Sequence, residues 1–181
     1  MRIKTSNLSD EACFLAFWNA ALVYQRENKL PLWPDYPATK IREEVQHGLH
    51  FSVFNPNDDL VGYFSVVLSD PVIWAGDEKG DAIYIHRMCV NPAVKGGRLA
   101  QYVLAWACGY AAAKKRKYVR MDTWGDNLRL VDYYTSCGFR HIRTRNLGDV
   151  PELPPHYNNA VLALFQNEIE VAEHSGGTLG R

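Results

Sequence analysis

The sequence has no excess of charge of either sign. Its 181 residues include 20 lysines and arginines and 20 aspartates and glutamates, so the formal net charge is zero. Nucleic acids and anionic membranes attract proteins that carry surplus positive charge. The charge balance therefore predicts that neither is a partner.

Paired cysteines and long apolar runs are also missing. Met1–Asp10 is polar, and no apolar run approaches the roughly 20 residues that span a bilayer. The cysteines have neither zinc-site spacing nor the density of a disulfide scaffold; they are Cys13, Cys89, Cys108 and Cys137. These absences predict a cytoplasmic protein with reduced thiols.

Metal and nucleotide signatures are absent as well. His47, His50, His141 and His156 show no ligand spacing to one another or to the cysteines, so no metal is expected. The chain has neither the glycine–lysine phosphate loop of nucleoside triphosphatases nor the three-glycine dinucleotide fingerprint. An unrelated mononucleotide-binding α/β domain stays open as one alternative.

What is present predicts an α/β (α+β) domain. A 47% hydrophobic content suffices for a core without disulfides, and we expect one domain over residues 1–167 with a loosely ordered tail over 168–181. Residues 69–80 and 147–157 are predicted loops, and Thr39 is expected to cap the second helix. The predicted strands are 2–5, 49–54, 60–68, 82–90, 118–124, 139–144 and 159–165. The predicted helices are about 10–28, 40–47, 97–113 and 127–137.

A short glycine loop follows the strand at 82–90. Lys95–Ala100 reads Lys-Gly-Gly-Arg-Leu-Ala and opens a helix. Free backbone N–H groups and the helix dipole favour an anion at such a place. A glycine pair alone is a weak signal of an anion site, and the neighbouring segments are more specific.

Those segments give a specific resemblance. His86–Pro92, the glycine loop, Asp122–Asn127 and Tyr134–Phe139 follow one another in the order seen in the GNAT superfamily of N-acetyltransferases, which the chain resembles most closely from Tyr84 to Phe139. The resemblance implies a mixed, mostly antiparallel sheet of six to seven strands flanked by about four helices. It also implies a cleft where strands 82–90 and 118–124 splay apart.

The resemblance further implies that acetyl-CoA is the cosubstrate. Arg98 departs from the pattern, since glycine is usual there, and it could either crowd the phosphate or contact it. The backbone of the strand end would hold the pantetheine arm, and the glycine loop the pyrophosphate. The implied coenzyme-binding residues are Met88, Cys89, Val90, Lys95, Gly96, Gly97, Arg98, Leu99, Ala100, Asn127 and Tyr134.

Tyr134 is the expected general acid. A phenol with a pKa of about 10 stays protonated at neutral pH and can donate to a departing thiolate, whose parent pKa is about 8.5. Asp122 and His86 are equal candidates for the base that accepts the ammonium proton. The competing interpretations are a salt bridge of Asp122 with Arg120 or another cation and a structural role for His86.

The acceptor stays open at this stage. A small-molecule amine and a protein amine both fit the pattern, and a homodimer is also kept open. Trp33, Tyr36, His156 and Tyr157 either line the acceptor pocket or simply pack. A catalytically inactive acyl-CoA-binding sensor is the alternative function, although it would not need an acid at Tyr134.

Overall fold

Seven strands form one sheet in the order β1-β2-β3-β4-β5-β7-β6. The structure, a computed structural model, describes residues 1–94 and 98–169. Neighbouring strands are antiparallel except for β4 and β5, which are parallel. The predicted mostly antiparallel sheet is confirmed. The strands are β1 Arg2–Thr5, β2 His50–Phe54, β3 Leu60–Val67, β4 Ala82–Val90, β5 Tyr118–Trp124, β6 His141–Asn146 and β7 Val161–Glu168.

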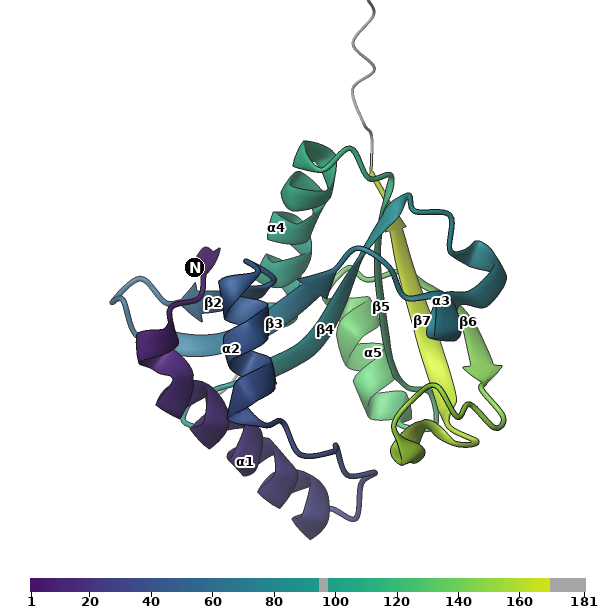
Figure 1. Ribbon diagram of the computed structural model, residues 1–181, viewed down its shortest axis with the longest axis horizontal. Helices are drawn as coiled ribbons and strands as arrows, with labels where there is room; N and C mark the ends of the chain where they lie inside the picture. Colours follow the sequence, from purple (N-terminus) through teal and green to yellow (C-terminus); the bar gives the residue numbers. More distant parts are fainter. Residues whose placement is uncertain (95–97, 170–181) are drawn as a thin grey trace, which may run out of the picture.

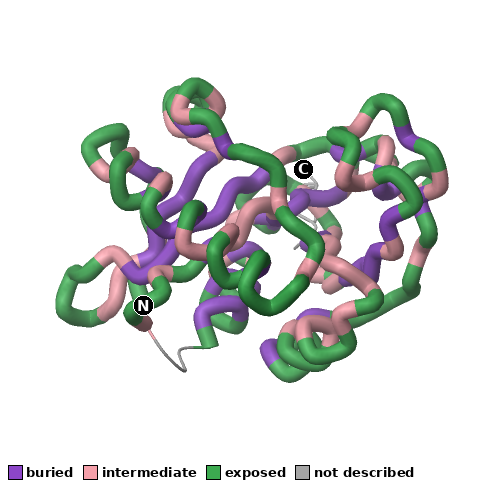
Figure 2. Tube along the Cα trace, turned by 90° about the horizontal axis from the view of Figure 1, so that it is seen from below, coloured by how far each residue is buried: buried purple, intermediate pink, exposed green. Residues whose placement is uncertain are grey.

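Helices cover both faces of the sheet. The α-helices are α1 Glu11–Glu27, α2 Ala38–Gln46, α3 Pro71–Trp74, α4 Leu99–Ala113 and α5 Leu128–Ser136. Helices α1 and α2 lie over one face of β2–β4, and α4 and α5 lie on the opposite face (Figure 1). The central strands are therefore buried from both sides (Figure 2).

Three predicted boundaries were wrong for local reasons. Thr39 does not cap α2, because the helix already begins at Ala38, and among the described residues no side chain caps it. The predicted loop 69–80 contains α3, whose first turn is capped by Asp70 Oδ1, which accepts from Ile73 N at 3.4 Å. Strand β6 starts later than expected, since Gly138 (φ 98°) and the residues after it form the turn out of α5.

The late strand and the tail also differ from expectation. Strand β7 runs from Val161 to Glu168, and Ile169 N donates to Lys117 O at 2.9 Å. Residues 170–181 lie outside the described part, so one domain over 1–167 with a tail over 168–181 stays a prediction. In the described ranges, no helix has the length and apolar character that crossing a bilayer requires.

A β-bulge interrupts β4 halfway along its length. Tyr63 pairs with Cys89 and Ser65 with His86, so β4 contains one residue more than β3 between these pairs. Arg87 lies in the bulge with φ 52°, a left-handed conformation that costs a non-glycine residue on the order of 1 kcal/mol. Bulges of this kind bend a strand and redirect its side chains.

Side-chain contacts hold Arg87 in this conformation. Its Nη1 lies 2.7 Å from Glu44 Oε1 and donates to Ser65 Oγ at 3.0 Å. The guanidinium carbon also lies 5.1 Å from the centre of the Tyr36 ring. Helix α2 and its preceding loop thus fix the bulge from one face of the sheet.

The parallel ladder between β4 and β5 ends where the bulge begins. Its last pair is Ile85 with Met121. Beyond that pair the two strands diverge, which is the splay that the resemblance implied. The ends of β4 and β5, with their side chains and backbone groups, are therefore free to line a cleft.

Candidate active site

Two cavities meet at the splayed strand ends. We call them the small cavity, of about 290 Å³, and the large cavity, of about 770 Å³. His86, Asp122 and Tyr157 line the small cavity, whereas Val90 and Asn127 line the large one. The residues that line both are Trp33, Met88, Thr123, Trp124 and Tyr134. Two molecules could therefore approach one point from two sides.

Tyr134 lies at this meeting point. Its ring, on α5, packs edge-on against Phe139 and Phe165 with centroid distances of 5.7 and 5.9 Å. Burial raises the pKa of Tyr134 well above its ordinary value, and the neighbouring Tyr133 acts in the same direction. The hydroxyl therefore stays protonated at neutral pH and can serve as a proton donor.

Three side chains from separate elements gather in the lining of the small cavity, and we call Asp70, His86 and Asp122 the carboxylate–histidine cluster. Each offers an atom within 4.8 Å of the others, and His86 Nε2 lies 3.3 Å from Asp70 Oδ2. Both base candidates from the sequence thus come together. Asp70, which the sequence left in a loop, joins them.

Asp122 has a perturbed acidity. Burial raises its pKa from 3.8 to about 6; His86 opposes this rise and Asp70 adds to it. A carboxylate with a pKa near 6 is a stronger base than an exposed one and is still ionised at neutral pH. This is the acidity expected of a general base.

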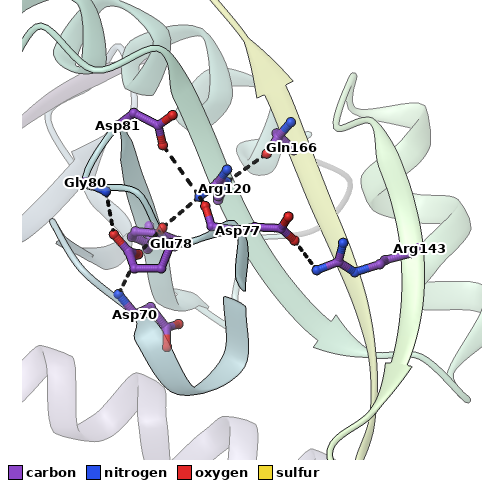
Figure 3. Close-up of polar contacts among 9 residues, drawn as sticks. Asp70, Asp77, Glu78, Gly80, Asp81, Arg120, Arg143 and Gln166 are labelled. Atoms are coloured by element: carbon purple, nitrogen blue, oxygen red, sulfur yellow. Dashed lines mark hydrogen bonds and ion pairs between the residues drawn. The ribbon is translucent and has the colours of Figure 1, made fainter. Parts of the chain in front are cut away.

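Arg120 was one of the cations that could have paired with Asp122, but it makes other contacts (Figure 3). Arg120 Nη1 donates to Tyr84 Oη and Asp77 O, both at 2.9 Å, and its Nε donates to Gln166 Oε1 at 2.8 Å. The guanidinium carbon also lies 4.8 Å from the centre of the Trp74 ring. Arg120 therefore ties the segment after α3 to the sheet.

Glu78 also belongs to this network, and its carboxylate holds the backbone of Asp70. Its carboxylate accepts from Asp70 N at 3.1 Å, from Gly80 N at 2.9 Å and from the Tyr84 hydroxyl (Figure 3). These hydrogen bonds outweigh burial and lower the pKa of Glu78, which stays ionised. The backbone of Asp70 is thereby positioned beside His86.

The spacing of the cluster would also suit a divalent cation, since one imidazole and two carboxylates are ordinary ligands. The sequence predicted no metal, and that expectation stays a prediction.

The large cavity gathers five of the eleven residues assigned to the coenzyme. Met88, Cys89, Val90, Asn127 and Tyr134 all line it. The Cys89 side chain is 2% exposed and packs in the core, so only its backbone faces the cavity's contents. Asn127 caps α5, where its Oδ1 accepts from Leu130 N at 3.2 Å.

The glycine loop is described only in part. Lys95, Gly96 and Gly97 lie outside the described residues. Leu99 and Ala100 begin α4 and are buried. The Arg98 guanidinium donates to Ser136 O at the end of α5. Its backbone, with φ −69° and ψ 57°, is open to any residue, so glycine is not required there.

Aromatic residues line the small cavity on two sides. One of the two interpretations was that aromatic residues of the loops line a pocket. The lining of the small cavity does include Trp33, His156 and Tyr157. Tyr36 instead packs in the core and donates to Glu44 Oε2 at 2.5 Å. Sequence reasoning missed Trp18, Trp124 and Asp70. Only Asp70 had a local signal, because Asp-Pro often starts a helix.

Comparison with known proteins gives matches to acetyltransferases. The family model described as "Acetyltransferase (GNAT) family" matches residues 15–139. An uncharacterized N-acetyltransferase of Bacillus subtilis, YesJ, is 26% identical over 94 residues, which are 50% of this chain and 52% of YesJ. The match thus spans about half the length of this curated relative.

Solved structures share the fold over nearly the whole chain. A GNAT-family acetyltransferase from Listeria monocytogenes superposes with a TM-score of 0.68 at 17% identity, covering 93% of this chain and 94% of its own. The yncA protein of Salmonella typhimurium, solved with acetyl-CoA, gives 0.65 at 15% identity and covers 99% of both chains. At such identities the likeness concerns the fold.

Proposed function

The chain belongs to the GNAT family of acetyltransferases, and on this premise we propose that it transfers the acetyl group of acetyl-CoA to a primary amine. The observation that carries the proposal is the position of Tyr134, which lines both cavities where β4 and β5 diverge. The donor would enter through the large cavity and the amine through the small one. Their reacting groups would meet beside Tyr134.

The large cavity suits the coenzyme. Residues Met88–Val90 follow the end of the β4–β5 ladder, so their backbone groups on that side can bind an extended amide chain as a strand would. The amide NH2 of Asn127 is the group left for a contact, because Oδ1 caps α5. A structure of this fold has been solved with acetyl-CoA, which supports the same donor here.

The chemistry follows from the groups at the junction. An amine arrives as an ammonium ion, and Asp122 or His86 removes a proton to free its lone pair. The nitrogen then forms a bond to the thioester carbon while the carbon–sulfur bond breaks. Tyr134 supplies the proton that the departing thiolate takes up. The nitrogen gives its second proton to the Tyr134 phenolate and the base releases the first to solvent, so the products are amide, thiol and one proton.

The test is turnover of acetyl-CoA with a panel of primary amines, followed as free thiol. Tyr134→Phe removes the acid while keeping the ring, and we expect kcat to fall by about 10²-fold or more. Tyr102→Phe is the matched control, because Tyr102 is 48% exposed on α4, away from both cavities. Wild-type turnover in Tyr134→Phe would contradict the assignment. Coenzyme binding without turnover in the wild type would support the sensor alternative.

A further inference from the structure

The residues that line the small cavity indicate which class of amine it can accept. We infer that, if the proposed transfer holds, the acceptor is a small primary amine with one ammonium group on a flat apolar or aromatic body. Three features of the cavity support this inference: the carboxylate–histidine cluster, the aromatic side chains in the lining and the volume.

The carboxylate–histidine cluster provides one site for a cation. Asp70 is 9% exposed, and its buried Oδ2 makes no hydrogen bond in the described structure, its nearest partner being His86 Nε2 at 3.3 Å. An unsatisfied buried acceptor is costly. An ammonium ion has three donors, which can reach Asp70 and Asp122 together. Among the described residues lining the cavity, these two are the carboxylates.

One aromatic side is formed by α1 and the loop after it. Trp18 and Trp33 stack with ring centroids 4.5 Å apart. Trp18 Nε1 donates to Pro34 O at 3.1 Å, and Trp33 N donates to Gln25 Oε1 at 2.9 Å. The Trp18 indole and the Trp33 backbone are therefore held in place, and both residues line the cavity.

The other aromatic side comes from β5 and the late loop. Trp124 lies 6.2 Å from Tyr157 and 6.1 Å from His156, measured between ring centroids. Burial lowers the pKa of His156, so this side is uncharged at neutral pH. Arg87 also lines the cavity, but its charge is paired with Glu44.

Size and polarity disfavour other acceptors. The small cavity has a volume of about 290 Å³, against about 770 Å³ for the large one. A polyamine would place its second ammonium ion against tryptophan faces, away from Asp70 and Asp122, where a cation–π attraction of about 0.5–2 kcal/mol offsets only part of the several kcal/mol that its desolvation costs. A peptide N-terminus would bury backbone amides against walls that offer few partners.

The probes are 2-phenylethylamine, n-butylamine, spermidine and a short peptide with a free N-terminal alanine. We expect kcat/KM for 2-phenylethylamine to exceed that for each of the others by at least ~10-fold. Trp33→Leu should remove most of this preference and Trp33→Phe should restore much of it, while Tyr102→Leu leaves it unchanged. Asp70→Asn should raise KM for the amine and leave KM for acetyl-CoA unchanged.

Direct binding separates this inference from the proposed transfer. Calorimetric titration of 2-phenylethylamine into wild type and Trp33→Leu needs no turnover, and weaker binding to the variant supports the aromatic site. Faster acetylation of spermidine or the peptide would overturn the inference and leave acetyl transfer standing. Turnover of no amine, with 2-phenylethylamine still bound, would refute transfer but not the amine site. Absence of 2-phenylethylamine binding would overturn the inference.

Discussion

Replacing Asp122 with asparagine should make the protein more stable and less active. Asp122 has a pKa raised from 3.8 to about 6, chiefly by burial. Folding therefore opposes its ionisation at pH 8, at a cost of about 3 kcal/mol when each pKa unit is worth about 1.4 kcal/mol. Because the amide needs hydrogen-bond partners too, we expect a gain in unfolding free energy of about 1–3 kcal/mol.

The pH dependence fixes the sign of this effect. Between pH 3.8 and 6 the folded protein binds the Asp122 proton more tightly than the unfolded chain does. The contribution of Asp122 to stability therefore falls as pH rises through this window. The advantage of Asp122→Asn should be full at pH 8 and should shrink to below about 1 kcal/mol at pH 4.

Urea unfolding followed by tryptophan fluorescence at pH 8 and pH 4 measures both values. Asp149→Asn is the matched control, because Asp149 is exposed, and it should change little at either pH. A variant less stable than wild type at pH 8, or a gain equal at both pH values, would refute the reasoning. If Asp122 is the base, kcat/KM should also fall by about 10²-fold or more; a larger fall in His86→Gln would assign that role to His86.

Three further predictions concern the support of the site. Arg98→Ala should leave the acetyl-CoA Kd within about threefold, because the guanidinium is bonded to Ser136 O; a rise of tenfold or more by calorimetry would contradict this. Gly62→Ala should lose about 1–3 kcal/mol in urea unfolding, since its Cβ would lie 2.7 Å from Cys89 O, whereas Gly109→Ala, with open space, should not. Treatment with EDTA should leave turnover unchanged; loss restored by Zn²⁺ would show that the carboxylate–histidine cluster binds a metal.

Much of the sheet could be predicted because its signals are local. Strands β4 and β5 begin and end at the predicted residues. Strand β4 stops before Pro92, because proline cannot donate to a ladder. Gly138 ends α5 with φ 98°, which favours glycine. Helix α3 was missed because four residues give too short a pattern to stand out from a polar loop.

The candidate site was only partly predictable. Tyr134 and Asn127 could be placed on one helix face by their spacing, and both line the large cavity. Asp122 was identified as a candidate by the resemblance. Whether its carboxylate pairs with Arg120 or lines the cleft depended on the direction of the Arg120 side chain. That in turn depended on Tyr84 and Gln166, which are distant in sequence.

By itself, the sequence determined the order of the strands and of every α-helix except α3, and the family; it also predicted Tyr134 as the proton donor. These follow from alternation, caps and short motifs, which act between residues close along the chain. Only the tertiary structure decided that Asp70 meets His86 and Asp122, and that tryptophans from α1, a loop and β5 enclose one cavity. Such contacts depend on the sheet order and on the bulge at Arg87, which no local pattern specifies.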